Sequence, residues 1–373
     1  MLKWIRRLLA TLLTIVVILV AIPLAGLGYG YLTTAPVAVS PSAPADDGAA
    51  QIAARLAAEI DGYKRPEEST FLTYPEWAIV YAAREYAGLV ENASPRTFPY
   101  WAYIGRFWQD YALMIRATAD YGFNFQNHLM LMVIGISHTV EHAVQWSYEN
   151  TIGWLTEFAV MFQPVPEDKY QARVAAEYAA FLDQVPWYRF PYAEKRAGLW
   201  DTEPATGLAA IRSWERKLGF GLAYSIKQGY ADLIKSGLDA TSEAALLDIH
   251  VWAEGPVAAA IAGEPDTELE QDLGADGAVF VTKRYQVFTD MIPRLIQRGV
   301  RFVEIGGNRL IFLTVTASEA IDAPDRTQTV FDYALPADRA TRRIGLIVPV
   351  GELHTVLPAL AQAGAVLEHV YDY

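Results

Sequence analysis

IPRLIQRG (292–299) and LPALAQAG (357–364) are two copies of one pattern, and they decide the fold of the C-terminal third of the chain. Proline, leucine, glutamine and glycine coincide in the two copies at an offset of 65 residues. The same offset superposes AVFVTK on the start of RIGLIVPV, and VRFVEI on AVLEHV. Each copy reads as strand, helix and strand, with a glycine just after the helix, where a left-handed residue is favoured. We therefore expect a duplicated α+β domain with a ferredoxin-like core over residues 245–373. Convergence on the same helix-end residues is the alternative.

Further short β-rich runs fill the rest of this region. They are LLDIHVWA (246–253), NRLIFLTVT (308–316) and TVFDYAL (329–335). Gly306-Gly307-Asn308 stands between two predicted strands, and this composition is typical of a hairpin turn.

The middle of the chain, residues 61–240, has helical periodicity and predicts an all-helical domain. Thr73-Tyr-Pro-Glu76 fits a capping box that opens a helix running towards Glu91. A long helix is expected over 126–162, with Gly135 and Gly153 as possible breaks or close-packing points. Two helices are expected between Leu208 and Ser236, parted near Gly219.

The N-terminus carries the apolar run LLATLLTIVVILVAIPLAGLG (8–28), preceded by Lys3, Arg6 and Arg7. A helix of this length rises about 31 Å, close to a hydrocarbon core of roughly 30 Å. We expect an uncleaved transmembrane signal anchor over 1–30, with a cleaved signal peptide as the alternative. The basic flank predicts a cytoplasmic N-terminus, so the protein would be a single-pass inner-membrane protein with its bulk in the periplasm. Residues 31–60 read as a Pro- and Ala-rich linker that ends in a short helix.

Composition excludes some partners. The chain has a net charge of −13, which repels phosphate backbones, so nucleic acid is not expected to bind. It contains no cysteine, so a hydrophobic core must hold the fold without disulfides.

His138-Thr-Val-Glu141-His142 is the motif with a chemical mechanism attached. On a helix, His138 and His142 lie on one face and could hold one metal, while Glu141 could act on a metal-bound water as general base. The H-x-x-E-H string resembles the motif of the inverzincin peptidases, which implies zinc and a third ligand from a downstream glutamate. Glu149 and Glu215 are the candidates. The motif lies within an all-helical region, unlike in that family.

We expect instead a polar stripe within a helical bundle and no cofactor, with zinc as the alternative. His138, His142, Gln145 and Glu149 follow one helix face. Buried charges need partners, and we expect arginines on neighbouring helices to supply them. The candidates are Arg84, Arg106 and Arg116.

Two segments are dense in aromatic residues, FPYWAYIGRFWQDY (98–111) and VPWYRFPY (185–192). Rings in such density either pack a core or line a hydrophobic pocket or membrane interface.

The sequence thus leaves three functions open, and with them the question of whether the protein is an enzyme. The first is a membrane-anchored cell-envelope binding or accessory protein, which recruits an envelope partner or a small hydrophobic ligand. The second is a metal-dependent hydrolase that uses His138, Glu141 and His142. The third is a subunit of a larger membrane complex.

Overall fold

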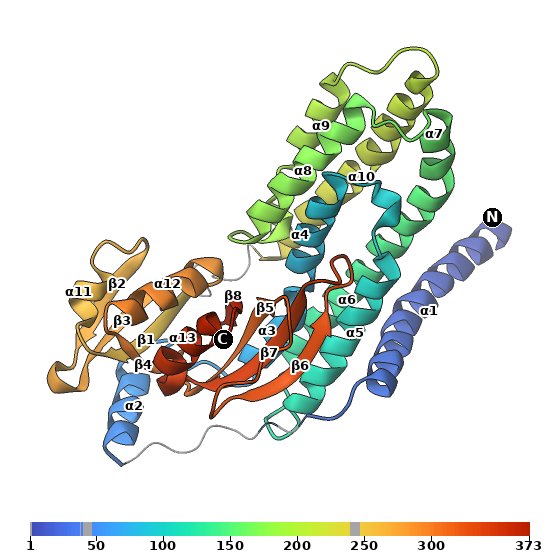
Figure 1. Ribbon diagram of the computed structural model, residues 1–373. Helices are drawn as coiled ribbons and strands as arrows, with labels where there is room; N and C mark the ends of the chain where they lie inside the picture. Colours follow the sequence, from blue (N-terminus) through green and yellow to red (C-terminus); the bar gives the residue numbers. More distant parts are fainter. Residues whose placement is uncertain (1, 38, 40–46, 239–246) are drawn as a thin grey trace.

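The computed structural model describes residues 2–37, 39, 47–238 and 247–373, and it combines a helical part with two β-sheets (Figure 1). The helices are α1 (Leu2–Thr33), α2 (Asp47–Glu59), α3 (Ser69–Glu76), α4 (Ala78–Val90), α5 (Tyr100–Ala117), α6 (Phe125–Tyr148), α7 (Trp154–Ala159), α8 (Pro166–Leu182), α9 (Tyr192–Asp201), α10 (Ala209–Leu238), α11 (Val257–Ile261), α12 (Gln286–Gln297) and α13 (Leu353–Gln362). The strands are β1 (Asp248–Glu254), β2 (Thr267–Asp272), β3 (Ala278–Lys283), β4 (Arg301–Ile305), β5 (Leu310–Ala317), β6 (Gln328–Ala334), β7 (Arg342–Pro349) and β8 (Val366–Tyr371).

The two sheets repeat one topology. Their strand orders are β2-β3-β1-β4 and β6-β7-β5-β8, and all pairings are antiparallel. This order, with a helix between the third and fourth strands, is that of a ferredoxin-like core. Gly299 and Gly364 follow the equivalent helices α12 and α13 with φ of 88° and 82°, as expected for residues that end a helix in the left-handed conformation. The second copy connects β5 to β6 through 318–327, a described segment without a helix.

The turn at Gly306-Gly307 does not form the predicted hairpin. Strand β4 pairs with β1, whereas β5 pairs with β7 and β8, so the turn joins the two sheets. Only an isolated bridge from Ile305 to Asn308 closes it, and Arg65 donates its backbone N–H to the Gly306 carbonyl from outside the turn. Both glycines have positive φ, so the turn chemistry was identified correctly but the pairing was not.

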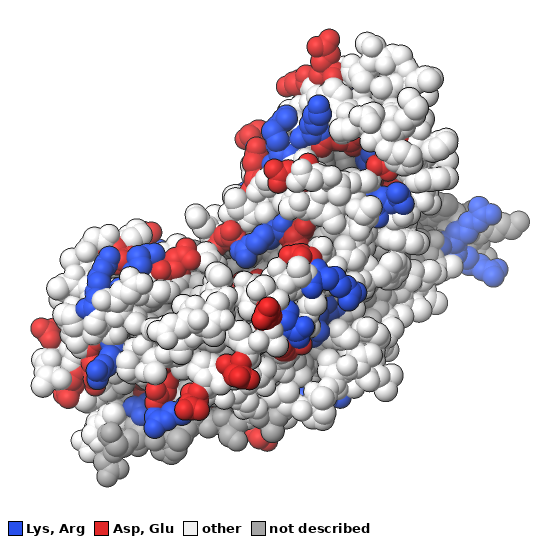
Figure 2. Space-filling view, in the orientation of Figure 1, with Lys and Arg blue, Asp and Glu red and all other residues white. Residues whose placement is uncertain are grey.

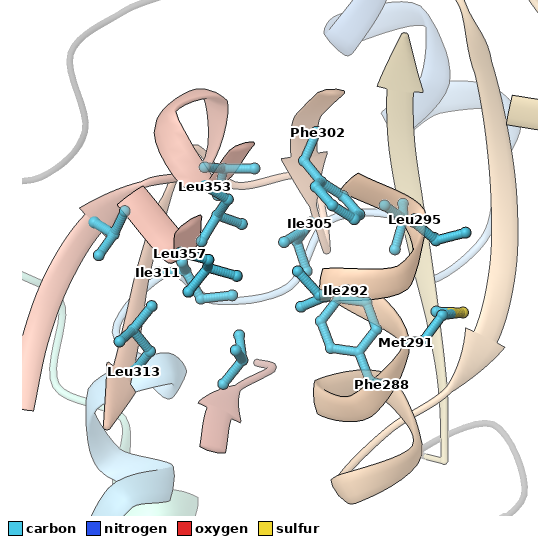
Figure 3. Close-up of a cluster of buried hydrophobic side chains, with 14 of the residues drawn as sticks. Phe288, Met291, Ile292, Leu295, Phe302, Ile305, Ile311, Leu313, Leu353 and Leu357 are labelled. Carbon is cyan, nitrogen blue, oxygen red and sulfur yellow. The ribbon is translucent and has the colours of Figure 1, made fainter. Parts of the chain in front are cut away.

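Both copies contribute to one hydrophobic core. Helices α12 and α13 place Phe288, Leu295 and Leu357 against Ile305 and Leu313 of the sheets (Figure 3). The other face of each sheet is covered by N-terminal helices. Leu56 of α2 packs on the first sheet, and Phe71 of α3 packs on the second.

The helical part differs from expectation at three places. Helix α10 is continuous through the predicted break. The absence of side chains at Gly219 and Gly221 lets Tyr148 and Trp200 approach its backbone. The long helix predicted over 126–162 contains a π-helical turn, η2 (Glu149–Gly153), between α6 and α7. Thr73 does not cap a helix: it lies inside α3, where its hydroxyl donates to the Ser69 carbonyl.

The prediction of a transmembrane anchor is wrong. Among the described residues, no helix combines the length and the apolar character needed to cross a membrane. The predicted single-pass topology and inner-membrane location are therefore wrong. Part of the apolar run serves the fold instead: Ile22 and Leu27 of α1 pack on the same core as Trp108 of α5. The glycines Gly26 and Gly30 let α1 approach Trp108 closely, because a Cβ at either position would overlap it.

Two predicted boundaries fall outside the described residues. These are the passage from the helical to the α+β region near residues 240–245 and part of the linker, at positions 38 and 40–46. The short helix expected at the end of the linker is α2.

Candidate functional site

The motif histidines lie side by side on the inner face of α6. His138 and His142 are buried, with ring centroids 4.0 Å apart, and His142 Nδ1 donates to the His138 carbonyl over 2.9 Å. His138 Nε2 is buried without a hydrogen-bond partner. Burial, and then the neighbouring His142, hold the pKa of His138 well below its ordinary value, so this imidazole is neutral at pH 7.

Glu141 turns away from both rings. Its side chain is 47% exposed, and its carboxylate lies 2.6 Å from Lys227 Nζ on α10. Burial raises the pKa of Glu141, but Lys227 and His142 outweigh this effect and leave the pKa below its ordinary value. A general base for a metal-bound water would have to face the histidines. Glu141 instead forms an ion pair on another side of the helix.

The two glutamates considered as a third metal ligand are engaged elsewhere. Glu149 binds Arg216, and Glu215 accepts from Tyr148 and Thr156 and pairs with Arg212. Within the described ranges, no group of three or more histidine, aspartate or glutamate side chains is arranged to hold a metal ion.

The arginines predicted to neutralise the stripe have other partners. Arg84 pairs with Asp183, Arg106 pairs with Asp110, and Arg116 binds oxygens of α1 and of Thr34 just after it. The cation that pairs with the stripe is Arg216 of α10, through Glu149, while Lys227 of the same helix pairs with Glu141 beside the stripe. The stripe is thus charge-paired, but by a helix that sequence reasoning did not consider.

His138 faces a small polar cavity between α3, α5, α6 and the second sheet. Tyr74 donates to Asp110 over 3.0 Å, Arg106 Nε donates to Asp110 over 2.8 Å, and Tyr74 and Tyr333 share a hydrogen bond of 2.8 Å. Burial raises the pKa of Asp110, and Arg106 opposes this rise. The cavity measures about 20 Å³. A single water needs roughly 10–15 Å³ by this measure, so an organic substrate does not fit.

A second, much larger pocket lies between α1, α3, α5 and α6. Its volume is about 600 Å³. Most of the lining is apolar and comes from distant segments: Leu27, Leu72, Ile115, Phe125, Leu129 and Met132. The segment 118–123 closes one side.

A few polar groups also line this apolar pocket. Tyr111 and His128 Nδ1 share a hydrogen bond of 3.2 Å, and Phe123 stacks on the His128 ring at 4.8 Å between centroids. Burial lowers the pKa of His128, which keeps the imidazole neutral. One cation, Arg116, and one anion, Glu68, complete the lining, so it carries no net charge.

The sequence predicted only part of the lining of this pocket. Tyr111 belongs to the first aromatic segment, 98–111, for which a pocket lining was one of the expected roles. The second aromatic segment, 185–192, packs a core instead, with Phe190 and Tyr192 buried. The hydrophobic lining from α1 and α6 carried no recognisable motif.

Comparison with known proteins adds no assignment: no protein-family model, no curated protein and no solved structure matches the chain.

Proposed function

We propose that this chain is a binding or accessory protein that holds a small, uncharged and mostly apolar molecule in the 600 Å³ pocket between α1, α3, α5 and α6. Binding sites for small molecules are typically apolar cavities of about 300–1,000 Å³ with few polar groups. The apolar pocket falls in this range. The polar cavity beside His138, at about 20 Å³, is far below it. This difference in volume is the observation that supports binding at the apolar pocket over chemistry at the histidines.

Charge favours a neutral ligand. The guanidinium of Arg116 donates to three neutral oxygens, the carbonyls of Tyr31 and Thr34 and the Thr34 hydroxyl. Glu68 accepts from Asn124. Because the lining holds one charge of each sign, it offers an ion of either sign no net attraction to offset the loss of its hydration. A neutral molecule avoids this loss.

Orientation would come from Tyr111 and His128. The hydroxyl of Tyr111 and the neutral ring of His128 offer a donor and an acceptor within an apolar surrounding. A hydroxyl or carbonyl on the ligand could join this pair, while the apolar body fills the space towards Leu72 and Met132.

Binding can be tested with N-phenyl-1-naphthylamine, a neutral apolar fluorophore, added to the full chain. Gly122 lines the pocket, and a Cβ added there meets no atom within 4 Å. Gly122→Phe should therefore occupy the pocket without disturbing the fold and weaken the probe at least tenfold. Gly88→Phe is the matched control, because Gly88 in α4 is exposed, equally unobstructed and lies outside the pocket. Equal affinity of wild type and Gly122→Phe would contradict the proposal, as would stronger binding of an anionic naphthalene sulfonate.

A further inference from the structure

The N-terminal half of helix α10 buries three cations and exposes several large apolar side chains. Arg212, Arg216 and Lys217 are 2%, 0% and 2% exposed. The large apolar side chains of the same stretch are 49–63% exposed: Ile211, Trp214, Leu218, Leu222 and Ile226. Monomeric proteins seldom expose a contiguous apolar patch of this kind without a function.

The buried charges are fully paired, so this orientation of α10 is specified by the fold. Arg216 binds Glu149 with two hydrogen bonds and reaches Asp168 at 2.9 Å. Arg212 also reaches Asp168, at 3.2 Å. Lys217 donates to the Trp200 carbonyl at 2.9 Å. Turning α10 over would bury its apolar face, but it would leave Glu149 and Asp168 without the cations that pair with them inside the bundle, which strongly destabilises a fold.

The neighbouring helix α7 extends the same surface. Arg212 donates to Thr156 on α7, which places the two helices side by side. The exposed positions of η2 and α7 include Ile152, Trp154, Leu155 and Phe158, and none of the exposed positions from 151 to 162 is charged. The edge of the molecule over α7 is accordingly free of charged side chains in Figure 2. We call these nine residues of α10, η2 and α7 the apolar helix face.

The size of this face matches a protein interface. A large side chain presents roughly 150–250 Å² when fully exposed, and these nine are about half exposed. Together they offer about 900 Å². A standard protein–protein interface buries about 800 Å² on each partner.

We propose that the apolar helix face is the interface with a second copy of this chain, paired about a two-fold axis with α10 against α10. A two-fold axis brings a surface against itself, so it demands self-complementarity. An uncharged face meets this demand, because no like charges oppose each other. Ala223 and Gly229 are exposed on the same helix and allow two backbones to approach closely.

Charge disfavours a lipid surface as the occupant. Helices that lie on membranes carry lysine and arginine beside their apolar face. Here Arg212, Arg216 and Lys217 are buried within the bundle, and the chain as a whole has a net charge of −13. A second copy needs no such cations.

Oligomeric state tests the proposal directly. Sedimentation of the full chain should show a dimer at low micromolar concentration. Leu222→Glu should raise the dimer dissociation constant at least tenfold, because it brings two carboxylates together in an apolar interface. Val366→Glu is the matched control: Val366 on β8 is 66% exposed and lies outside the face, so this variant should dimerise like wild type. Circular dichroism verifies that both variants fold.

Disulfide trapping gives a second readout that does not depend on weakening the dimer. Because the chain has no cysteine, a single Leu222→Cys variant can cross-link only to its own copy. It should form a covalent dimer on mild oxidation, whereas Val366→Cys should not. A wild-type monomer at 100 μM would overturn the proposal. So would binding to phosphatidylcholine vesicles that Leu222→Glu abolishes. Gly122→Phe should dimerise normally, which separates this proposal from ligand binding in the apolar pocket.

Discussion

Arg216 and Glu149 form a bidentate ion pair in the interior of the helical bundle. The Arg216 Nη1 and Nη2 atoms each donate to one Glu149 oxygen over 2.8 Å, and the two side chains are 0% and 1% exposed. Glu149 opens the π-helical turn, whose last residue is Gly153. A Cβ at Gly153 would lie 2.8 Å from the Glu149 carboxylate, so this glycine makes room for the pair.

Removing one partner of this pair should strongly destabilise the protein. Glu149→Leu removes the bidentate partner of Arg216 and leaves only Asp168 and the more distant Glu215 beside it, and we expect a loss of about 3–5 kcal/mol in the free energy of unfolding. Urea denaturation measures it. The control is Glu352→Leu, which removes the partner of the mostly exposed Arg326 and should change stability by less than about 1 kcal/mol. Similar losses in the two variants would contradict this account of the pair.

The motif glutamate, Glu141, should contribute much less to stability than Glu149. Both members of the Glu141–Lys227 pair are partly exposed, so solvent screens their attraction. Glu141→Gln should therefore lower the free energy of unfolding by less than about 1 kcal/mol.

Addition and chelation of zinc should shift the melting temperature equally in wild type and in His138→Ala. A zinc-dependent stabilisation lost in His138→Ala would instead show that the histidines bind metal.

The sequence predicted best those features that depend on local chemistry. The helix-end glycines Gly299 and Gly364 were recognisable because glycine is strongly preferred where a residue ends a helix in the left-handed conformation. Strand β2, TELEQD, was missed because it is an edge strand whose side chains are mostly solvent-exposed and lack the apolar alternation of a buried strand.

Features that depend on tertiary packing could not be predicted from the sequence. Periodicity shows that α10 has two faces, but hydrophobicity alone assigns the charged one to solvent, which is the reverse of the observed arrangement. The spacing of the HTVEH motif places His138 and His142 on one face correctly, yet it does not show that Lys227 draws Glu141 away. The apolar pocket is assembled from residues as distant as Leu27 and Met132, none of them distinctive in sequence.

The two helix-end glycines should respond alike to alanine. A Cβ meets nothing within 4 Å at Gly364 and only ordinary contacts with Pro256 at Gly299, so the change acts through backbone strain. We expect each alanine variant to lose about 1–2 kcal/mol in the free energy of unfolding. Gly88→Ala is the control: Gly88 is equally unobstructed but lies inside α4, where alanine should stabilise by about 0.5–1 kcal/mol. Unequal losses at Gly299 and Gly364 would show that the two copies are not equivalent at this turn.

Stability should also depend on pH through two acids at the junction of α3 and the second sheet, the half-buried Glu76 and the buried Asp372. Burial raises the pKa of Glu76 to about 7 and that of Asp372 to about 6, and Arg284 opposes both shifts. The ordinary values are 4.5 and 3.8, so between about pH 4 and pH 7 the folded protein retains protons that the unfolded chain releases. These groups therefore make the free energy of unfolding fall as pH rises through this window, and their effect is constant above about pH 7.

Glu76→Gln isolates one of these contributions. Buried His138 and His369, whose pKa values are held well below the ordinary one, act in the opposite direction, because they destabilise the fold as pH falls below about 6.5. The informative quantity is thus the difference between variant and wild type in urea denaturation at each pH. It should be near zero at pH 4, where Glu76 is protonated in both states, and reach about 1–3 kcal/mol in favour of the variant at pH 8. Glu91→Gln, at an exposed helix end, is the control and should show no such trend. A Glu76→Gln variant less stable than wild type at pH 8 would mean that the charged carboxylate is stabilised by Arg284 more than burial destabilises it.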